Sequence, residues 1–338
     1  MSTEAHPHAA QILRVALVVP LVYGAAITLG AEMPFIAAFL YAIFALKMAA
    51  PPPFKSIVLL ALLLVLLPLG FASIAGLLKQ YPYMMIGFVG LVLFHAFRLQ
   101  AVAKTALIGV LMQTFAIMLP VVTGQSEQAA GVVSGAFALN GALAVAGLYL
   151  GFALFPARGA PGPAPLPGGT DDPVERTREA AVAAVVMLPP FTLLLTLNLT
   201  SAMRILFTIA VVLVSLNRRD VRETGIESVL SAVFAGVAAL AYTVLYAFWP
   251  ESAAALLAMA FLGLLVVPYA FEGPHRGAVA LAVPLTWVLL GTAGEEAASR
   301  TLEWCLYSVV GVLYAVWARA LVLALFGWRK APPVAAPG

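Results

Sequence analysis

Two charged residues lie three positions apart in the apolar last segment of the chain. Arg300 and Glu303 share one face of a predicted helix, which Tyr307 continues. A charge inside a membrane span costs about 2.5–3.5 kcal/mol on insertion scales, so such residues usually face a cavity or a partner. A guanidinium there can hold an anionic substrate beside a carboxylate that exchanges protons. The alternative is an interfacial ion pair in which Arg300 extends to the lipid headgroups.

Three further polar residues fall inside apolar runs. Arg204 can join Arg300 in an outward-facing basic pocket. Such a pocket would suit carboxylates, because a guanidinium binds them through paired hydrogen bonds. The alternative is that Arg204 anchors its helix at the membrane interface. Glu227 could serve as the proton-carrying carboxylate of a proton-coupled exporter. The alternative is a charge at a helix end that pairs with a nearby arginine. Asn140 is a buried amide, which hydrogen bonding between helices also explains.

The elements that must position these residues are membrane spans. The chain has 338 residues, of which 63% are hydrophobic and 10% are charged, with a mean hydropathy of +1.03. An average soluble protein has about a quarter charged residues, whereas a helix that crosses the bilayer needs about 20 mostly apolar ones. The composition therefore predicts an integral membrane protein and excludes an ordinary soluble domain.

Twelve apolar runs, bounded by glycine, proline or charge, predict an all-α protein with about twelve transmembrane helices. The runs are too long, and alternate too little, for the strands of a barrel. They cover residues 11–29, 33–50, 54–78, 81–97, 102–122, 129–155, 180–199, 202–216, 224–248, 252–271, 277–290 and 297–327.

The distribution of basic residues predicts cytoplasmic N and C termini. With that orientation, only Lys79, Arg204 and Arg300 of the 18 lysines and arginines fall on the outer side. An electropositive inner rim would concentrate cytosolic anions at an entrance, although topology alone also requires such residues. The candidates for this entrance are Lys47, Lys55, Arg98, Arg218, Arg219 and Arg222. The positive charge of the chain does not imply nucleic acid.

Metal, redox and nucleotide chemistry are not expected. Cys305 is the single cysteine, no Cys/His spacing resembles a zinc or iron–sulfur site, and no Walker motif occurs. We therefore expect no metal, no cofactor and no enzyme activity. The alternative, a membrane-embedded enzyme acting on lipid-like substrates, would need clustered His, Asp or Glu at one membrane face.

The sequence predicts that the chain consists of two copies of a six-helix unit. Residues 156–173 form a linker rich in proline and glycine between residues 1–155 and residues 174–338. Across it, Pro20 corresponds to Pro190, Met33 to Met203 and Gly141 to Gly311. Since six is even, the two repeats are parallel and related by an axis along the membrane normal.

Both halves carry the features that mark a substrate region in repeat transporters. Their first helices are interrupted by Pro20 and by the pair Pro189–Pro190, and their second helices are short. We therefore place Pro20, Pro190, Asn140 and Tyr307 with the charged candidates along a pathway between the repeats.

These patterns resemble the fusaric acid resistance superfamily, which includes bacterial aromatic acid exporters. The resemblance covers nearly the whole chain, without the soluble domains of the larger exporters. It rests on the proline-broken first helix, the short second helix, the basic loop into the third helix and the form of the last helix, with the residues Arg218, Arg219, Arg222, Thr224, Gly225, Arg300, Glu303 and Gly311.

The resemblance implies an efflux permease of the bacterial inner membrane. Its substrates would be organic or aromatic carboxylate anions, and a periplasmic membrane fusion protein is an implied partner besides membrane lipid. We expect a proton-coupled secondary transporter. A passive anion channel and a non-transporting scaffold are the alternatives within the membrane.

Overall fold

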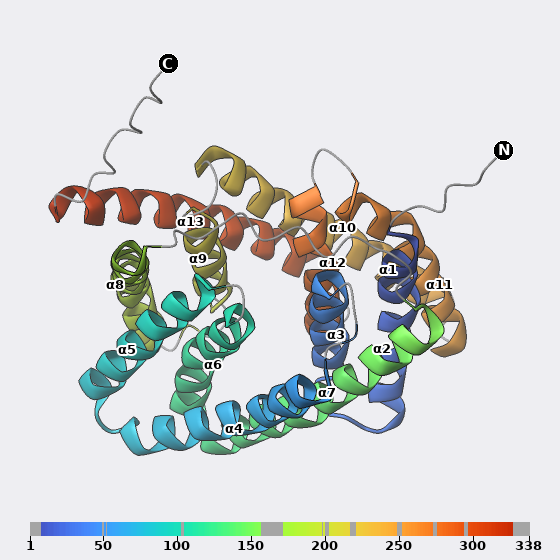
Figure 1. Ribbon diagram of the computed structural model, residues 1–338, viewed down its shortest axis with the longest axis horizontal. Helices are drawn as coiled ribbons and strands as arrows, with labels where there is room; N and C mark the ends of the chain where they lie inside the picture. The colour runs from blue at the N-terminus through green and yellow to red at the C-terminus, as the bar shows by residue number, and fades with distance from the viewer. Residues whose placement is uncertain are drawn as a thin grey trace.

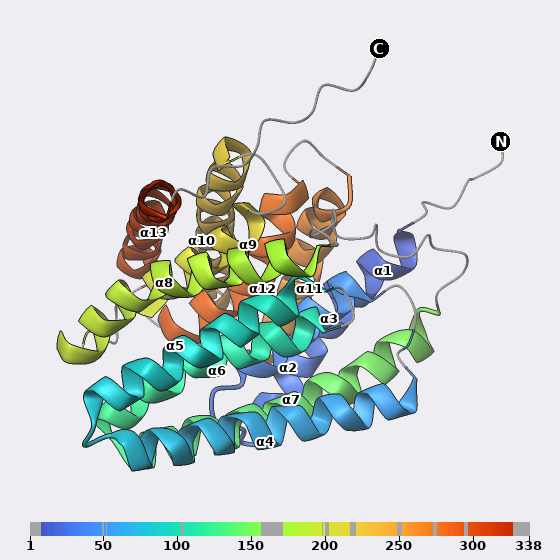
Figure 2. The ribbon, with the colours of Figure 1, turned by 60° about the vertical axis from the view of Figure 1, so that its left-hand side comes forward.

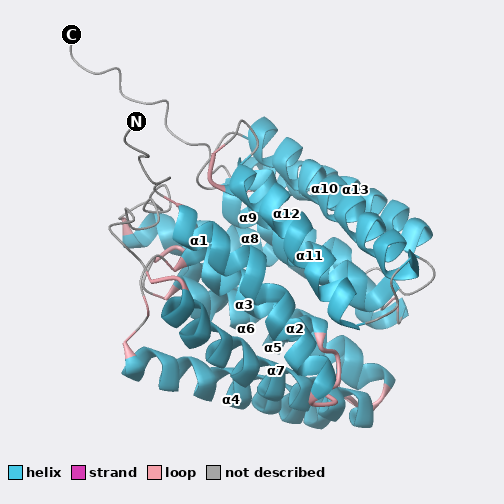
Figure 3. Ribbon diagram, turned by 90° about the vertical axis from the view of Figure 1, so that its right-hand side faces the viewer, coloured by secondary structure: helices cyan, strands magenta, loops and turns pink. Residues whose placement is uncertain are grey.

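The computed structural model is helical throughout the part of the chain that it describes, and no strand occurs there (Figure 3). The described residues are 8–48, 51, 53–102, 105–156, 172–197, 199, 203–216, 221–248, 252–272, 276–293 and 297–326.

The helices fall before and after the linker. Those before it are α1 (Ala9–Leu13), η1 (Arg14–Val18), α2 (Val19–Thr28), α3 (Phe35–Lys47), α4 (Phe54–Leu78), α5 (Pro82–Gln100), α6 (Ala106–Gln125) and α7 (Glu127–Leu154). Those after it are α8 (Pro173–Leu197), α9 (Met203–Leu216), α10 (Val221–Phe248), α11 (Ser252–Val266), η3 (Val267–Ala270), α12 (Arg276–Ala293) and α13 (Ala297–Leu325).

Within the described residues, nine helical segments are long and apolar enough to cross a membrane. Such a set is that of a multi-pass helical membrane protein. Three other apolar helices are shorter, and they belong to α3, α9 and α12. The 13 residues of α3 and 14 residues of α9 extend only about 20 Å at 1.5 Å per residue, which is less than the hydrocarbon thickness. The count of twelve spans therefore stays a prediction.

The first helix widens immediately before its proline. α1, η1 and α2 follow one another without a break, and η1 is a π-helix that ends two residues before Pro20. Proline has no N–H to donate to the preceding turn, and its ring displaces the carbonyl there. Single π turns inside α-helices are frequent at functional sites. The interruption expected at Pro20 thus takes the form of a widened turn.

The interruption expected at Pro189 and Pro190 is wrong, because α8 continues as an α-helix through both residues. Pro190 cannot bond the carbonyl of Val186, one turn earlier. The Tyr314 hydroxyl, from α13, donates to that carbonyl at 3.0 Å instead. A neighbouring helix has supplied the missing donor, so the helix is not interrupted.

The helices pack as two pairs on opposite sides of the molecule, with the other helices between these pairs. In Figure 1, α4 and α7 lie along one side and α10 and α13 along the opposite side. α5 packs against α8 at one end, while α11 packs against η1 and α2 at the other. α3 contacts α12 between them, and Figure 2 shows α5 between α8 and α4. One apolar core cluster extends through both parts of the chain.

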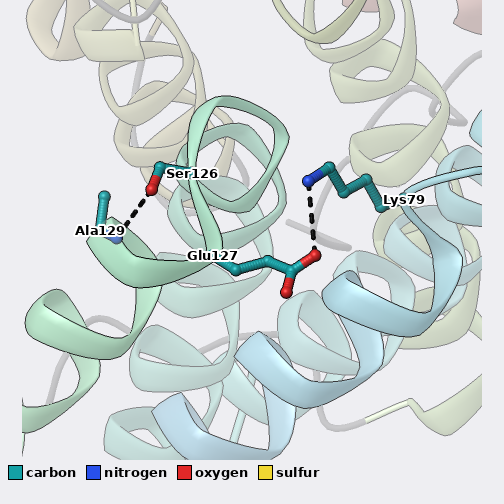
Figure 4. Close-up of polar contacts among 4 residues, drawn as sticks. All are labelled: Lys79, Ser126, Glu127 and Ala129. Atoms are coloured by element: carbon teal, nitrogen blue, oxygen red, sulfur yellow. Dashed lines mark hydrogen bonds and ion pairs between the residues drawn. The ribbon is translucent and has the colours of Figure 1, made fainter.

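An exposed ion pair joins α4 to α7 at one end of the molecule (Figure 4). The Nζ atom of Lys79 lies 3.4 Å from Oε1 of Glu127, and the Ser126 hydroxyl accepts a hydrogen bond from the Ala129 N–H at 3.3 Å. Ser126 therefore caps α7, and the Glu127 carboxylate is favoured in the first turn of that helix.

The correspondence of Gly141 with Gly311 is not supported by their contacts. A Cβ on Gly141 would meet Leu64 of α4, whereas a Cβ on Gly311 would meet Thr208 of α9. A Cβ on Gly147, later on the same helix as Gly141, would meet Val22 of α2 and Tyr41 of α3. Gly141 and Gly311 therefore have different neighbours, and the duplication stays a prediction.

Candidate functional site

A buried arginine lies in the widened turn of the first helix. Arg14 is 1% exposed, and its guanidinium carbon lies 4.1 Å from the centre of the Phe152 ring. Its Nε–H donates to the carbonyl of Ala10 at 3.2 Å. The Nη1 and Nη2 atoms are buried without a hydrogen-bond partner among the described residues. A charged group in apolar surroundings thus keeps four of its N–H groups unused.

The surroundings of Arg14 are close-packed. The buried Tyr41 hydroxyl donates to the carbonyl of Arg14 at 3.2 Å. A Cβ on Gly151 would lie 2.5 Å from that hydroxyl oxygen, so glycine is needed for α7 to approach α3 this closely. Gln11 holds the start of the helix in place, because its amide donates to the carbonyls of Ala45 and Leu46 at the end of α3.

A cavity of about 490 Å³ lies on the other side of the same turn. Residues of η1, α2, α10, α11, η3 and α12 line it, among them Val15, Ala16, Pro20, Phe234, Tyr242 and Trp287. The cavity therefore lies between the first helix and helices that follow the linker.

The cavity lining is almost entirely apolar. The Tyr242 hydroxyl donates to the carbonyl of Met259 at 2.9 Å, and the Thr286 hydroxyl donates to that of Ala282 at 2.9 Å. Trp287 lies between Tyr23 and Tyr242, with ring centres 5.2 Å and 6.0 Å away. Because these two hydroxyls are turned to backbone and most of the lining is apolar, the space suits the apolar body of a ligand.

Arg204, which we predict to join Arg300 in a basic pocket, contacts the helix that carries Arg300. The Arg204 guanidinium carbon lies 3.2 Å from the centre of the Trp304 ring, so α9 and α13 meet through a cation–π contact. Arg300, one turn before Trp304, and Tyr307 are half-buried. The Glu303 side chain is exposed. The structure therefore does not turn Glu303 towards the helices that surround Arg204.

Glu227 lies against the beginning of another helix. A Cβ added to Gly277 would overlap its carboxylate oxygens. Gly277 is the second residue of α12, where a negative charge is favoured by the helix dipole. This placement brings Glu227 to a helix terminus, and Glu227 is not among the residues that line the cavity.

Asn140 and Pro190 have contacts within the helix packing. The Asn140 amide donates to the carbonyls of Glu32 and Ala136, both at 2.8 Å, and so joins α7 to the segment after α2. Pro190 is buried inside α8. Neither residue lines the cavity, whereas Pro20 does.

The predicted entrance residues that the structure describes are exposed. Lys47 ends α3, Lys55 lies in the first turn of α4, and Arg98 lies in the last turn of α5. Arg218 and Arg219 lie outside the described residues, and so does the side chain of Arg222. Within the described part of the chain, no three His, Cys, Asp or Glu side chains gather to hold a metal ion.

Arg14 is the residue that sequence reasoning did not single out, because we counted it only among the inner basic residues. One signal could have found it. It lies six residues before Pro20 in an apolar run, where a charge has an energetic cost that needs an explanation.

Comparison with known proteins gives one match. Residues 11–151 match a family described as "Protein of unknown function (DUF2955)". No curated protein and no solved structure matches the chain. The family gives no link to the fusaric acid resistance superfamily, so that resemblance stays an expectation. The chain is thus similar, from α1 to the last turn of α7, to a family whose activity is unknown.

Proposed function

We propose that the chain is a secondary transporter that exports organic or aromatic carboxylate anions across the bacterial inner membrane. The observation that carries this proposal is the apolar cavity of about 490 Å³ beside the π-helical turn that precedes Pro20 in the first helix. Sites for small organic ligands are concave and mostly apolar, and π turns inside α-helices are frequent at functional sites.

The helix contacts support a layout of two six-helix repeats. α3 packs on α7 as α9 packs on α13, and α4 packs on α6 and α7 as α10 packs on α12 and α13. The first helix of each part packs on the fourth helix of the other part, as α2 on α11 and α8 on α5. The opposed positions of these pairs in Figure 1 fit a two-fold axis near the centre of that view.

The layout suggests how a transporter would work. Rigid-body rocking of one repeat against the other would expose the cavity to alternate sides of the membrane. The cavity is bounded by helices from both parts of the chain, so such a movement would change its shape. The inner rim of Lys47, Lys55 and Arg98 would attract anions from the cytosol.

Three parts of this proposal rest on the sequence. The distribution of lysine and arginine supports cytoplasmic termini and twelve spans. The resemblance to aromatic acid exporters supports the direction of transport and the class of substrate. The same resemblance supports a periplasmic membrane fusion protein as a partner.

The test is flux of labelled benzoate, 4-hydroxybenzoate and succinate in proteoliposomes with and without an imposed pH gradient. A proton-coupled exporter shows saturable flux that the gradient drives. Flux that neither saturates nor responds to the gradient indicates a passive channel. If no acid crosses vesicles in which correct insertion of the protein is verified, the proposal is wrong, and a membrane-embedded enzyme or a scaffold is favoured instead.

A pair of variants on α10 tests the cavity. Ala238 lines the cavity, whereas Val233 on the same helix does not and is exposed. Ala238→Phe is expected to fill part of the space and abolish most of the flux. Val233→Phe adds a ring outside the cavity and is expected to leave the flux unchanged. Equal flux in both variants would place the pathway elsewhere.

A further inference from the structure

We infer that Arg14 is the residue that binds the carboxylate group of the transported acid, at a site in the widened turn of the first helix. This inference rests on the proposed function and adds to it the group that recognises the charge of the substrate. The site is separate from the cavity, because Val15 and Ala16 line the cavity, whereas Arg14 contacts Tyr41 of α3 and Phe152 of α7. Arg14 would therefore hold the acid before the acid enters the cavity.

The hydrogen-bonding capacity of Arg14 indicates the class of ligand. A guanidinium has five N–H donors. The Nε–H donates to the carbonyl of Ala10, and the guanidinium carbon lies 4.1 Å from the centre of the Phe152 ring. The edge formed by Nη1 and Nη2 has no hydrogen-bond partner among the described residues. This planar edge fits the two oxygens of a carboxylate through parallel hydrogen bonds.

The energetic cost of the arrangement supports a ligand. A buried charge without a partner destabilises a folded protein, and natural proteins retain such groups chiefly at functional sites. Arg14 is 1% exposed, so its guanidinium is shielded from bulk water. A carboxylate would satisfy the free edge and neutralise the charge.

The surroundings hold the guanidinium in one position. The Gln11 amide fixes the start of α1 on the end of α3, and the Tyr41 hydroxyl bonds the carbonyl of Arg14 itself. Gly151 leaves the space that Tyr41 occupies. A charged donor held by its neighbours in this way loses little conformational entropy when it binds.

The location fits capture of a cytosolic anion. The Nε–H bond directs the guanidinium back towards Ala10, at the start of the helix. Lys47 ends α3, the helix whose last turn Gln11 contacts. With cytoplasmic termini, Arg14 lies at the inner end of the helices, inside the basic rim. Its burial corresponds to a closed form, which a separation of η1 from α7 would open.

The first experiment measures ligand-induced thermal stabilisation of the full-length protein in detergent, with benzoate as the probe and chloride at matched ionic strength. Wild type is expected to show a rise in Tm with benzoate. Arg14→Met is expected to lose this rise while its Tm without ligand is equal or higher, because the unpaired charge is gone. Arg14→Lys keeps the charge but not the planar edge, and is expected to need on the order of tenfold more benzoate.

The matched control is Arg178→Gln, which removes a positive charge from α8, the first helix after the linker. It is expected to respond to benzoate like wild type. The inference is overturned if wild type shows no stabilisation by benzoate, or if Arg14→Met retains the wild-type response. Should Arg14→Met fail to fold, an unchanged affinity in Arg14→Lys overturns it instead.

Flux in proteoliposomes separates this inference from the proposed function. If wild type carries benzoate and Arg14→Met carries it with the same KM, Arg14 is not the binding residue while transport stands. If benzoate binds in an Arg14-dependent manner but no flux occurs, the anion site stands and the transporter proposal fails.

Discussion

The hydroxyl of Tyr314 donates a hydrogen bond to the carbonyl oxygen of Val186, at 3.0 Å, across the contact between α13 and α8. Val186 lies four residues before Pro190, which has no N–H to reach it. The side chain of one helix thus replaces a backbone donor that another helix lacks.

Removal of this hydroxyl leaves a buried carbonyl unsatisfied. Tyr314→Phe is expected to lower the free energy of unfolding by about 1–3 kcal/mol, measured by thermal unfolding in detergent. Tyr149 on α7 is exposed, so Tyr149→Phe is a control that should change the free energy of unfolding little. Pro190→Ala restores the N–H, and in that background the cost of Tyr314→Phe should fall. An equal cost in both backgrounds would contradict this account.

The glycines of α7 allow close helix approach at two positions. A Cβ on Gly151 would lie 2.5 Å from the Tyr41 hydroxyl, and one on Gly147 would overlap Val22. Gly151→Ala and Gly147→Ala are each expected to destabilise by about 1–3 kcal/mol. Gly135, on the same helix, has nothing within 4 Å of such a Cβ. Gly135→Ala should therefore be neutral, or stabilise by up to about 1 kcal/mol.

Glu227 and Gly277 are expected to be energetically coupled. Gly277→Ala forces the carboxylate of Glu227 to move, and because this carboxylate is the end of a flexible side chain, the expected cost is only up to about 1 kcal/mol. In the Glu227→Ala background there is no carboxylate to displace, so the same change should cost less. A double-mutant cycle measures the difference. Additive costs would show that the contact does not determine stability.

The contact between Arg204 and Trp304 is expected to contribute about 0.5–2 kcal/mol of coupling between α9 and α13. The measurement is a double-mutant cycle of Arg204→Met and Trp304→Ala on thermal stability. Trp317 is exposed on the same helix, so Trp317→Ala should add to Arg204→Met without coupling. Coupling of equal size for both tryptophans would indicate a general effect of the charge.

The two charges at the start of α13 are expected to differ in flux assays. The Glu303 side chain is exposed, so Glu303→Gln should retain benzoate flux within about twofold, since exposed charges contribute little. Arg300 is half-buried and lies one turn before Trp304 on the same face of α13, so Arg300→Ala should reduce flux more. A larger loss in Glu303→Gln would restore Glu303 as the carboxylate of the pathway.

Much of the architecture follows from the sequence alone. Lipid as solvent requires long apolar helices with internally satisfied backbones, so composition and run lengths predict a multi-pass helical protein. Proline chemistry likewise predicts a disturbed turn near Pro20, and the structure has a π-helix there.

Only the tertiary structure decided which side chains meet. α13 is apolar on its lipid-facing and packed sides alike, so hydrophobic periodicity could not show that Glu303 is exposed while Tyr314 is turned towards α8. Asn140 and Glu32 are 108 residues apart in the chain, and Tyr314 and Val186 are 128 apart. The contacts of Arg14 were likewise decided by the tertiary structure, although its charge is evident in the sequence. Its burial beside Tyr41 and Phe152 depends on how closely α3 and α7 approach the first helix, which only the packing of distant segments determines.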